Sequence, residues 1–422
     1  MHSPFDLLAL LLVLSAGLAY LNYRVLKLPM TVGLLVGAAA GALLLIALDA
    51  VVPSLGLKLG IRGLVGSINF PAALLDGFLA FLLFAGAFQV NSADMFARKW
   101  TILALATFAT ILSTTLVAAA LLAVSRLLGL GISLPWCLVF GALISPTDPV
   151  SVLDVLKRIG IPRGLQAVVA GESLFNDGIG VVLFTLALSL TTGSPINHLG
   201  PTTIASLFLL EAVGGGLLGL GFGYLTFLLI RHVDDYNVEL IISLALASGT
   251  YSAAGLLGVS GPIAVVVAGI LIGQGMDGAM TETTRQHLMT FWRLVEEILN
   301  ALLFLTIGLE IAAIDLDRRS IIAMAVMIPT VLVIRWLSVT ASALPLNLHL
   351  PGRYGSLLIL TWGGLRGGLS VAMALSLPDS PNKASILTIA YGIVVFSIVG
   401  QGLTLETVAR RALAGRADGY PG

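Results

Sequence analysis

The apolar run at residues 164–191 contains a polar segment, GESLFNDGIG at 171–180, whose side chains suit the binding of an ion. Ser173, Asn176 and Asp177 are spaced i, i+3 and i+4, which places them on one face of a helix. A hydroxyl, an amide and a carboxylate together suit a desolvated hard cation, because oxygen donors replace its water and the carboxylate offsets its charge. We therefore predict that this face binds a hard cation.

Glu172, in the same segment, is expected to have a different role. Its position in the sequence turns its side chain by about 140° from that of Asp177, since a helix rotates by about 100° per residue. An ionisable group within a membrane is costly unless it is paired or hydrated. The two arginines at mid-span, Arg335 and Arg366, are therefore candidate partners for Glu172 in a structural ion pair.

Thr147 and Asp148 form a second polar cluster, bracketed by Pro146 and Pro149 in the middle of the apolar run 131–153. Proline lacks a backbone donor and clashes with the preceding turn, so this pair is expected to unwind the helix locally. The freed carbonyl groups then become available as cation ligands. A simple proline kink in which Asp148 bonds the broken backbone is the alternative, and the two interpretations are compatible.

Arg366 lies in a third unusual segment, the apolar run 354–378, where glycines surround it. Glycines at this density weaken a helix and allow other backbones to approach closely. We therefore predict a second interrupted span here. The glycines concerned are Gly363, Gly364, Gly367 and Gly368.

The composition places these segments in a membrane protein. Of 422 residues, 58% are hydrophobic and 10% are charged, with a mean hydropathy of +1.03, which leaves too few polar groups to cover a water-soluble domain. The 22 basic and 22 acidic residues give no net charge, so no nucleic-acid partner is expected. The single cysteine, Cys137, excludes an intramolecular disulfide and is expected to be an inert buried thiol. No basic residues precede the first apolar run, which favours a retained helix over a cleaved signal peptide.

Hydropathy predicts an all-α polytopic fold embedded in the lipid bilayer. A bilayer core requires about 20 apolar residues per helix, and dividing the sequence on this basis predicts about 13 transmembrane helices. The expected spans are 5–22, 28–53, 70–91, 100–125, 131–153, 164–191, 203–230, 237–257, 260–275, 291–313, 320–343, 354–378 and 386–408.

The charges in the connections predict orientation, and the order of the spans predicts internal symmetry. Most Lys and Arg residues follow odd-numbered spans or lie in the tail, so the N-terminus is expected outside and the short tail 409–422 in the cytoplasm. We expect one domain with two six-helix repeats, at about 5–191 and 237–408, joined by a linker span at 203–230. The interrupted fifth and twelfth spans then hold the same place in each repeat, which is typical of inverted-repeat transporters.

Five stretches, in order along almost the whole chain, resemble the first family of monovalent cation/proton antiporters, the sodium/proton exchangers of bacteria and eukaryotes. They are GALISPTDPVSVLDVL at 141–156, GESLFNDGIGVVLF at 171–184, SGPIAVVVAGILIG at 260–273, NALLFLTIGLEI at 300–311 and WGGLRGGLSVAMAL at 362–375.

The resemblance implies a secondary active transporter, and not an enzyme, that exchanges Na+ or Li+ for protons without a cofactor. It also implies a homodimer in the plasma (inner) membrane, interrupted helices that cross near the midplane, and a role in pH homeostasis. Asp177 matches the family's essential carboxylate. The residues that match its companions at the ion are Asn176, Ser173, Thr147 and Asp148. Glu172 and Arg335 match a structural ion pair of the family. Arg366 matches an arginine that neutralises carboxylates or backbone dipoles.

The chain departs from this family at one position. Several relatives carry a glutamate in the third helix, where this chain has Ala85 within LAFLLFAGAF at 79–88. Asp76 lies more than two turns away and is a poor substitute. The ligand shell is therefore expected to lack one oxygen donor, which leaves the preference among Na+, Li+ and K+ open. Potassium/proton exchange is the alternative function, and the role of Glu310 is undetermined.

Asp177 is expected to bind either a cation or a proton, and never both, so that competition between the two couples their movements. Asn176 stands where a second acid would add another charge. A loaded site then exchanges one charge for one charge, and transport is predicted to be electroneutral.

Two other classes of protein fit these residues less well. An intramembrane hydrolase would need a histidine base beside Ser173 at membrane depth. The histidines all fall in expected loops or at a terminus, and they are His2, His198, His232, His287 and His349. A passive cation channel would need rings of like groups or a carbonyl filter, and the sequence indicates neither.

Overall fold

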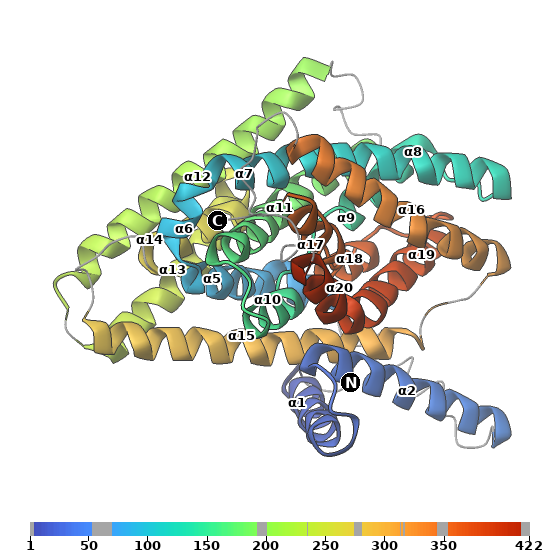
Figure 1. Cartoon of the computed structure of the whole chain (residues 1–422), viewed down its shortest axis with the longest axis horizontal. Coiled ribbons are helices and arrows are strands. Elements are labelled where there is room, and N and C mark those ends of the chain that lie inside the picture. The colour runs from blue at the N-terminus through green and yellow to red at the C-terminus, as the bar shows by residue number, and fades with distance from the viewer. Residues whose placement is uncertain are drawn as a thin grey trace.

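The computed structural model describes residues 4–52, 70–191, 201–233, 235–273, 281–312, 314, 317–343 and 353–414. These residues form helices joined by short connections, and they contain no strand, which confirms the all-α prediction (Figure 1). Eight of the described helices are long and apolar enough to cross a membrane, and three shorter apolar helices accompany them.

The described helices up to the middle of the chain are α1 (Pro4–Leu21), η1 (Asn22–Leu26), α2 (Met30–Val51), α4 (Phe70–Ala73), η3 (Leu74–Phe78), α5 (Leu79–Gln89), α6 (Ser92–Ala97), α7 (Lys99–Leu103), η4 (Ala104–Ala109), α8 (Thr110–Leu128), α9 (Leu134–Ile144), α10 (Val150–Arg158) and α11 (Arg163–Ser189). The η elements are π-helical turns, and α4, η3 and α5 run on without a break, as do α7, η4 and α8.

The remaining described helices are α12 (Pro201–Ile230), α13 (Tyr236–Leu257), α14 (Gly261–Gly273), α15 (Glu282–Glu310), α16 (Arg318–Ala343), α17 (Arg353–Trp362), α18 (Gly368–Leu375), α19 (Lys383–Phe396), η6 (Ser397–Gln401) and α20 (Gly402–Ala414). Figure 1 shows α15 running along one side of the bundle, with α2 packed beside it.

The helices coincide with the hydropathy spans, but α15 begins earlier than the expected start at residue 291. Thr281 caps the helix, because its side chain accepts a hydrogen bond from the Thr284 backbone N–H, so the helix begins at Glu282. Polar residues such as Arg285 and His287 suggested a loop, whereas they lie on the first two turns of the helix. The side chain of Asp76 and residues 415–422 of the tail lie outside the described part of the chain.

Both predicted interruptions are present, and they meet. Residues 145–149 separate α9 from α10, and residues 363–367 separate α17 from α18. The Asp148 backbone N–H donates to the Leu365 carbonyl at 2.7 Å, so the two breaks bond directly to each other. This contact confirms that the two interrupted helices cross.

The helix that carries the polar segment 171–180 lies in the interior of the bundle. In its most apolar 18-residue window α11 has 78% of its residues buried, against 11% for α1, so α11 is enclosed by other helices whereas α1 faces outward. Small residues allow close packing around this centre. Gly141 of α9, for example, faces the Thr114 carbonyl of α8 so closely that a Cβ there would overlap with the oxygen.

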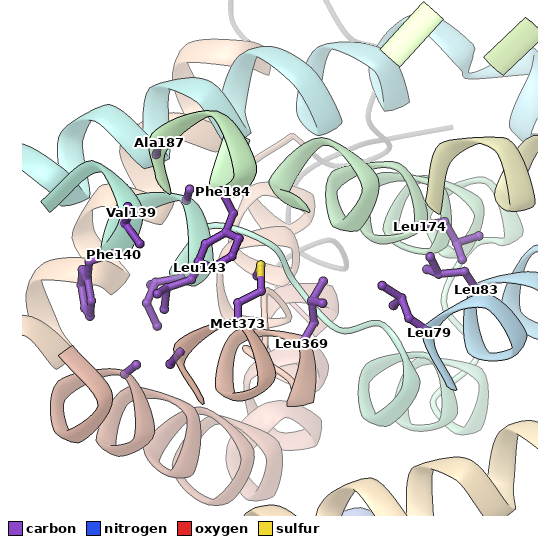
Figure 2. Packing of buried hydrophobic residues seen from close by; sticks show 14 of the residues in the cluster. Leu79, Leu83, Val139, Phe140, Leu143, Leu174, Phe184, Ala187, Leu369 and Met373 are labelled. Carbon is purple, nitrogen blue, oxygen red and sulfur yellow. The ribbon is translucent and has the colours of Figure 1, made fainter. Parts of the chain in front are cut away.

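A buried apolar cluster runs through the bundle past the crossing, with Val139 and Phe140 at one end of the view and Leu83 and Leu174 at the other (Figure 2). It includes Val139, Phe140 and Leu143 of α9, and the Phe184 side chain of α11 lies close to Leu143 in the same view. Met373 of α18 is fully buried in this cluster. These side chains leave the interrupted segments covered by apolar packing on the side where α9 begins and α11 ends.

Candidate ion-binding site

The polar face of α11 lies against the break between α9 and α10. Asn176 donates through Nδ2 to the Thr147 hydroxyl at 2.8 Å and accepts from the Thr147 backbone N–H at 3.3 Å. The Thr147 hydroxyl also lies 3.1 Å from the Ser173 hydroxyl. The Asn176 amide thus uses both of its ends to hold the unwound segment against α11, which keeps the oxygens of Thr147 and Ser173 together.

Asp148 continues the unwound segment and also bonds the first residue of the helix that follows. One of its carboxylate oxygens, Oδ1, accepts from the Val150 backbone N–H at 2.9 Å. A Cβ at Gly367 would lie 2.6 Å from the Asp148 Cβ and 2.7 Å from its Oδ2, so only glycine fits at that point of the crossing. The bond from Oδ1 supports the interpretation in which Asp148 bonds the broken backbone, and the ligand role of Asp148 stays a prediction.

Asp177 is partly exposed and lines a cavity of about 70 Å³ at the crossing. The same cavity is lined by Thr147, Asp148 and Ser370, so oxygen atoms from three elements surround it. Among the described residues, no Lys or Arg forms a salt bridge with Asp177. Its carboxylate is thus accessible and free to bind a mobile ion or a proton.

A much larger cavity, of about 690 Å³, lies beside the small one. It is lined by residues of α10 and by the first turns of α11, including Asp154, Lys157 and Arg163. The residues that line both cavities are Gly86, Pro149, Val150, Leu174, Glu296 and Asn300. The shared lining places the wide cavity next to the small one that Asp177 lines, and we call the two together the path to Asp177.

Glu172 points away from this path and is paired. Its Oε1 lies 2.6 Å from Nη1 of Arg335 in α16, and the two side chains are 2% and 5% exposed. Arg335 also donates through Nη2 to the Leu360 carbonyl at 3.1 Å. Gly364 lies beside the guanidinium, where a Cβ would be 2.6 Å from Arg335 Nε. The pair thus links α11, α16 and the end of α17.

Arg366 is buried, and it neutralises backbone dipoles at the crossing. Its guanidinium donates to the carbonyl of Ser145 and, at 2.9 Å, to that of Pro146. A cation at the C-terminal end of α9 offsets the partial negative charge of the unpaired carbonyls there. This arrangement differs from the expectation that the freed carbonyls become cation ligands, because Arg366 occupies two of them.

A polar chain holds the Arg366 segment in place. The Arg366 backbone N–H donates to the Ser397 hydroxyl at 2.9 Å, and Ser397 donates to Gln401 Oε1 at 2.8 Å. Gln401 in turn donates through Nε2 to the Trp362 carbonyl at 3.0 Å. No sequence pattern pointed to these hydrogen bonds, because Ser397 and Gln401 lie far along the chain from Arg366.

Several other residues of the path were also missed. Glu296 and Asn300 line it from α15, and Gln89 contacts it from α5, whereas the expected span contained no functional residue there. Two adjacent acids, Glu296 and Glu297, within an otherwise apolar helix were the available signal. Glu310 is buried at the end of α15 and lines neither of these two cavities.

The described histidines do not support hydrolytic chemistry at Ser173. His232 and His287 are exposed, at the ends of α12 and α15, and the remaining three lie outside the described residues. Among the described residues no group of three or more His, Cys, Asp or Glu side chains is placed to hold a metal ion. The Ser173 hydroxyl instead lies within hydrogen-bond distance of the Thr147 hydroxyl.

The model of the family described as "Sodium/hydrogen exchanger, transmembrane" matches residues 10–411. The chain belongs to the sodium/hydrogen exchanger family. It is 40% identical over 418 residues to the Na(+)/H(+) antiporter NhaP of Pseudomonas aeruginosa, with 97% of each protein covered. It is 39% identical over 355 residues to the Na(+)/H(+) antiporter NhaH of Halobacillus dabanensis, covering 83% of this exchanger and 85% of that protein.

The fold of this exchanger also resembles solved structures. The sodium proton antiporter MjNhaP1 from Methanocaldococcus jannaschii superposes with a TM-score of 0.73 at 20% sequence identity. The superposition covers 96% of this exchanger and 97% of that chain. At this identity the likeness concerns the fold, and it agrees with the family assignment of an integral membrane transporter.

Proposed function

We propose that this exchanger is a secondary active antiporter that exchanges Na+ for protons, with Asp177 binding each in turn. The observation that carries the proposal is the placement of Asp177. Its carboxylate lines a cavity that continues into a wide one, and no described residue pairs with it. The names of the two relatives, both Na(+)/H(+) antiporters, support Na+ as the cation.

The cation is held by oxygens from the crossing and from α11. The carboxylates of Asp177 and Asp148 supply charge, and the hydroxyls of Ser173 and Thr147 replace water. Asn176 acts by fixing Thr147, because both ends of its amide are used in that contact. Li+ prefers the same hard oxygen donors and is transported by the same route.

Competition at Asp177 couples the two ions. A cation at the carboxylate excludes a proton, and a proton removes the charge that holds the cation. Each half-cycle therefore carries one positive charge through the site. Because Asn176 contributes no charge, the exchange is one for one and electroneutral.

The arrangement corresponds to a state that is open to the cytoplasm. The wide cavity is lined by Lys157 and Arg163, and the positive-inside rule assigns such residues to the cytoplasmic side. On the other side, Leu143 and Phe184 belong to the buried apolar cluster (Figure 2). Transport then requires the apolar side to open while the wide cavity closes, with the crossing moving against the rest of the bundle.

The experiment that tests this function is proton flux in proteoliposomes that contain the purified protein. With an internal pH dye, adding Na+ or Li+ should release protons from acid-loaded vesicles, while K+ should have little effect. A response to K+ alone would establish the potassium/proton alternative. Clamping the membrane potential with K+ and valinomycin should leave the Na+ rate unchanged, and a strong dependence on potential would contradict one-for-one exchange.

The variant Asp177→Asn tests the carrier directly. It should reduce Na+-driven proton flux to that of protein-free liposomes, because an amide binds neither a proton nor a cation with the required strength. Asp154→Asn is the matched control, since Asp154 lines the wide cavity but not the small one. If Asp177→Asn still exchanges Na+ for protons, the assignment is wrong.

The homodimer and the plasma-membrane location implied by the resemblance stay predictions. Crosslinking and mass measurement of the protein in lipid nanodiscs would test the first. Accessibility of cysteines placed on each side in intact cells would test the second together with the cytoplasmic C-terminus.

A further inference from the structure

The path from the wide cavity to Asp177 passes a narrow segment that we call the neck. It is formed by the six residues that line both cavities, Gly86, Pro149, Val150, Leu174, Glu296 and Asn300. Four of these are apolar or glycine. Glu296 and Asn300, the two polar members, lie one helical turn apart on α15 and therefore on the same face.

The Glu296 side chain is half-buried and held in place by Gln89. Gln89 Nε2 donates to Glu296 Oε2 at 2.5 Å and also bonds to the Ala85 carbonyl at 3.0 Å. This contact uses one carboxylate oxygen and fixes its position above α5. Among the described residues, no Lys or Arg forms a salt bridge with Glu296, so its negative charge is not neutralised by a cationic side chain.

Asn300 adds an unsatisfied polar group to the neck. Its side chain is 6% exposed, and its Nδ2 is buried without a hydrogen-bond partner among the described residues. A buried amide with an unused group is costly unless a ligand or water completes it. A water molecule that a cation retains would do so, because its oxygen accepts from the Asn300 N–H.

The charges around Glu296 are distributed along the path. Asp94, Asp154 and Glu297 line the wide cavity together with Lys157, Arg163 and Arg293, so both signs are present there. None of these six charged residues lines the small cavity, whereas Glu296 lines both cavities. The other acids of the small cavity are Asp148 and Asp177. A cation that moves inward therefore meets Glu296 after the mixed charges and before the final site.

We propose that Glu296 is a second binding carboxylate for the transported cation, an intermediate position at which the ion loses part of its water before it reaches Asp177, while Asn300 donates to a water that the ion retains. This inference rests on the proposed function. A cation that enters a neck lined by Leu174 and Val150 loses hydration there, and a carboxylate at that point offsets the loss. Glu296 thus acts on the affinity for the cation, whereas Asp177 carries it.

The test measures the apparent KM for Na+ and kcat in proteoliposomes for three variants. Glu296→Gln should raise KM about tenfold through the loss of one nearby negative charge, with kcat within about twofold of wild type. Glu296→Asp keeps the charge and should give an intermediate KM. Glu297→Gln is the matched control, because it removes a charge from the adjacent residue, which is exposed and lines only the wide cavity.

The possible outcomes separate this inference from the proposed function. Wild-type protein that fails to exchange Na+ for protons would overturn the function itself. Active wild type with an unchanged KM in Glu296→Gln, or with a fall in kcat alone, would overturn the role of Glu296. An equal rise of KM in Glu297→Gln would show a general surface-charge effect and would also overturn it. If Glu296→Gln does not fold, two other variants give the answer: Glu296→Asp, and Gln89→Leu, which removes the hydrogen bond to the Glu296 carboxylate. A wild-type KM for Na+ in both variants would overturn the role as well.

Discussion

Glu172 and Asp177 lie on the same helix, less than two turns apart, and the structure gives them opposite surroundings. Glu172 is 2% exposed and lies 2.6 Å from Arg335. Asp177 is partly exposed, lines a cavity and has no ion pair among the described residues. The difference shows that the neighbours on α16 and at the crossing decide whether an acid on α11 is held in an ion pair or faces a cavity.

The largest effect is expected from breaking the paired acid. Arg335→Ala would leave the Glu172 carboxylate buried without its cation, and such a loss costs about 3–5 kcal/mol. We expect a marked fall in thermal stability, measured by fluorescence-detected size exclusion of heated protein in detergent. The double variant Glu172→Gln/Arg335→Gln removes both charges and should recover most of the loss. A single variant as stable as wild type would mean that the pair does not stabilise the fold.

A smaller loss of stability is expected from crowding the crossing near the free acid. A Cβ at Gly367 would lie 2.6 Å from the Asp148 Cβ, so Gly367→Ala should separate the two breaks and destabilise the protein by about 1–3 kcal/mol. Transport should fall more than stability, because Asp148 moves relative to Asp177.

The matched control for this substitution is Gly249→Ala in α13. No atom lies within 4 Å of a Cβ at Gly249, and alanine is the better helix former, so this variant should be as stable as wild type or more stable. Equal behaviour of the two variants in the heating assay and in proton flux would contradict a tight crossing.

The sequence predicted these features unequally, for physical reasons. Proline and glycine act on their own backbone, so Pro146, Pro149 and the glycines around Arg366 predicted both interruptions from local chemistry alone. Helical geometry likewise turned Glu172 away from Asp177 before any partner was known. Both of these predictions depend on residues that are close in the chain.

The contacts that the sequence did not predict join residues far apart. Gln89 and Glu296 are separated by 207 positions, and their hydrogen bond depends on how α5 and α15 pack. The capture of the Ser145 and Pro146 carbonyls by Arg366 spans a similar separation. No local pattern encodes such contacts. The acid expected at Ala85 is absent, yet Gln89 places the Glu296 carboxylate within reach of the same turn of α5.

The comparison becomes sharper when the proton concentration is varied. If Na+ and protons compete for Asp177, lowering the pH by one unit in the range where the site is protonated should raise the apparent KM for Na+ about tenfold, or about 1.4 kcal/mol. The rate at saturating Na+ should change little. Proteoliposome assays at several pH values with equal pH on both sides provide the measurement. A constant KM with a falling maximal rate would indicate separate sites for the two ions.

The smallest effect is expected from removing one neutral oxygen donor of the proposed cation site at Asp177. Ser173→Ala takes away a hydroxyl that lies 3.1 Å from that of Thr147, while Asn176 still holds Thr147 in place. One hydrogen bond or ligand of this kind contributes about 1 kcal/mol, so the apparent KM for Na+ should rise about fivefold and the fold should persist. Thr185→Ala on the same helix is the control, because its exposed hydroxyl bonds only to the Val181 carbonyl. A stability loss in Ser173→Ala comparable to that of Arg335→Ala would mean that the polar face of α11 is structural. The distinction between Glu172 and Asp177 would then fail.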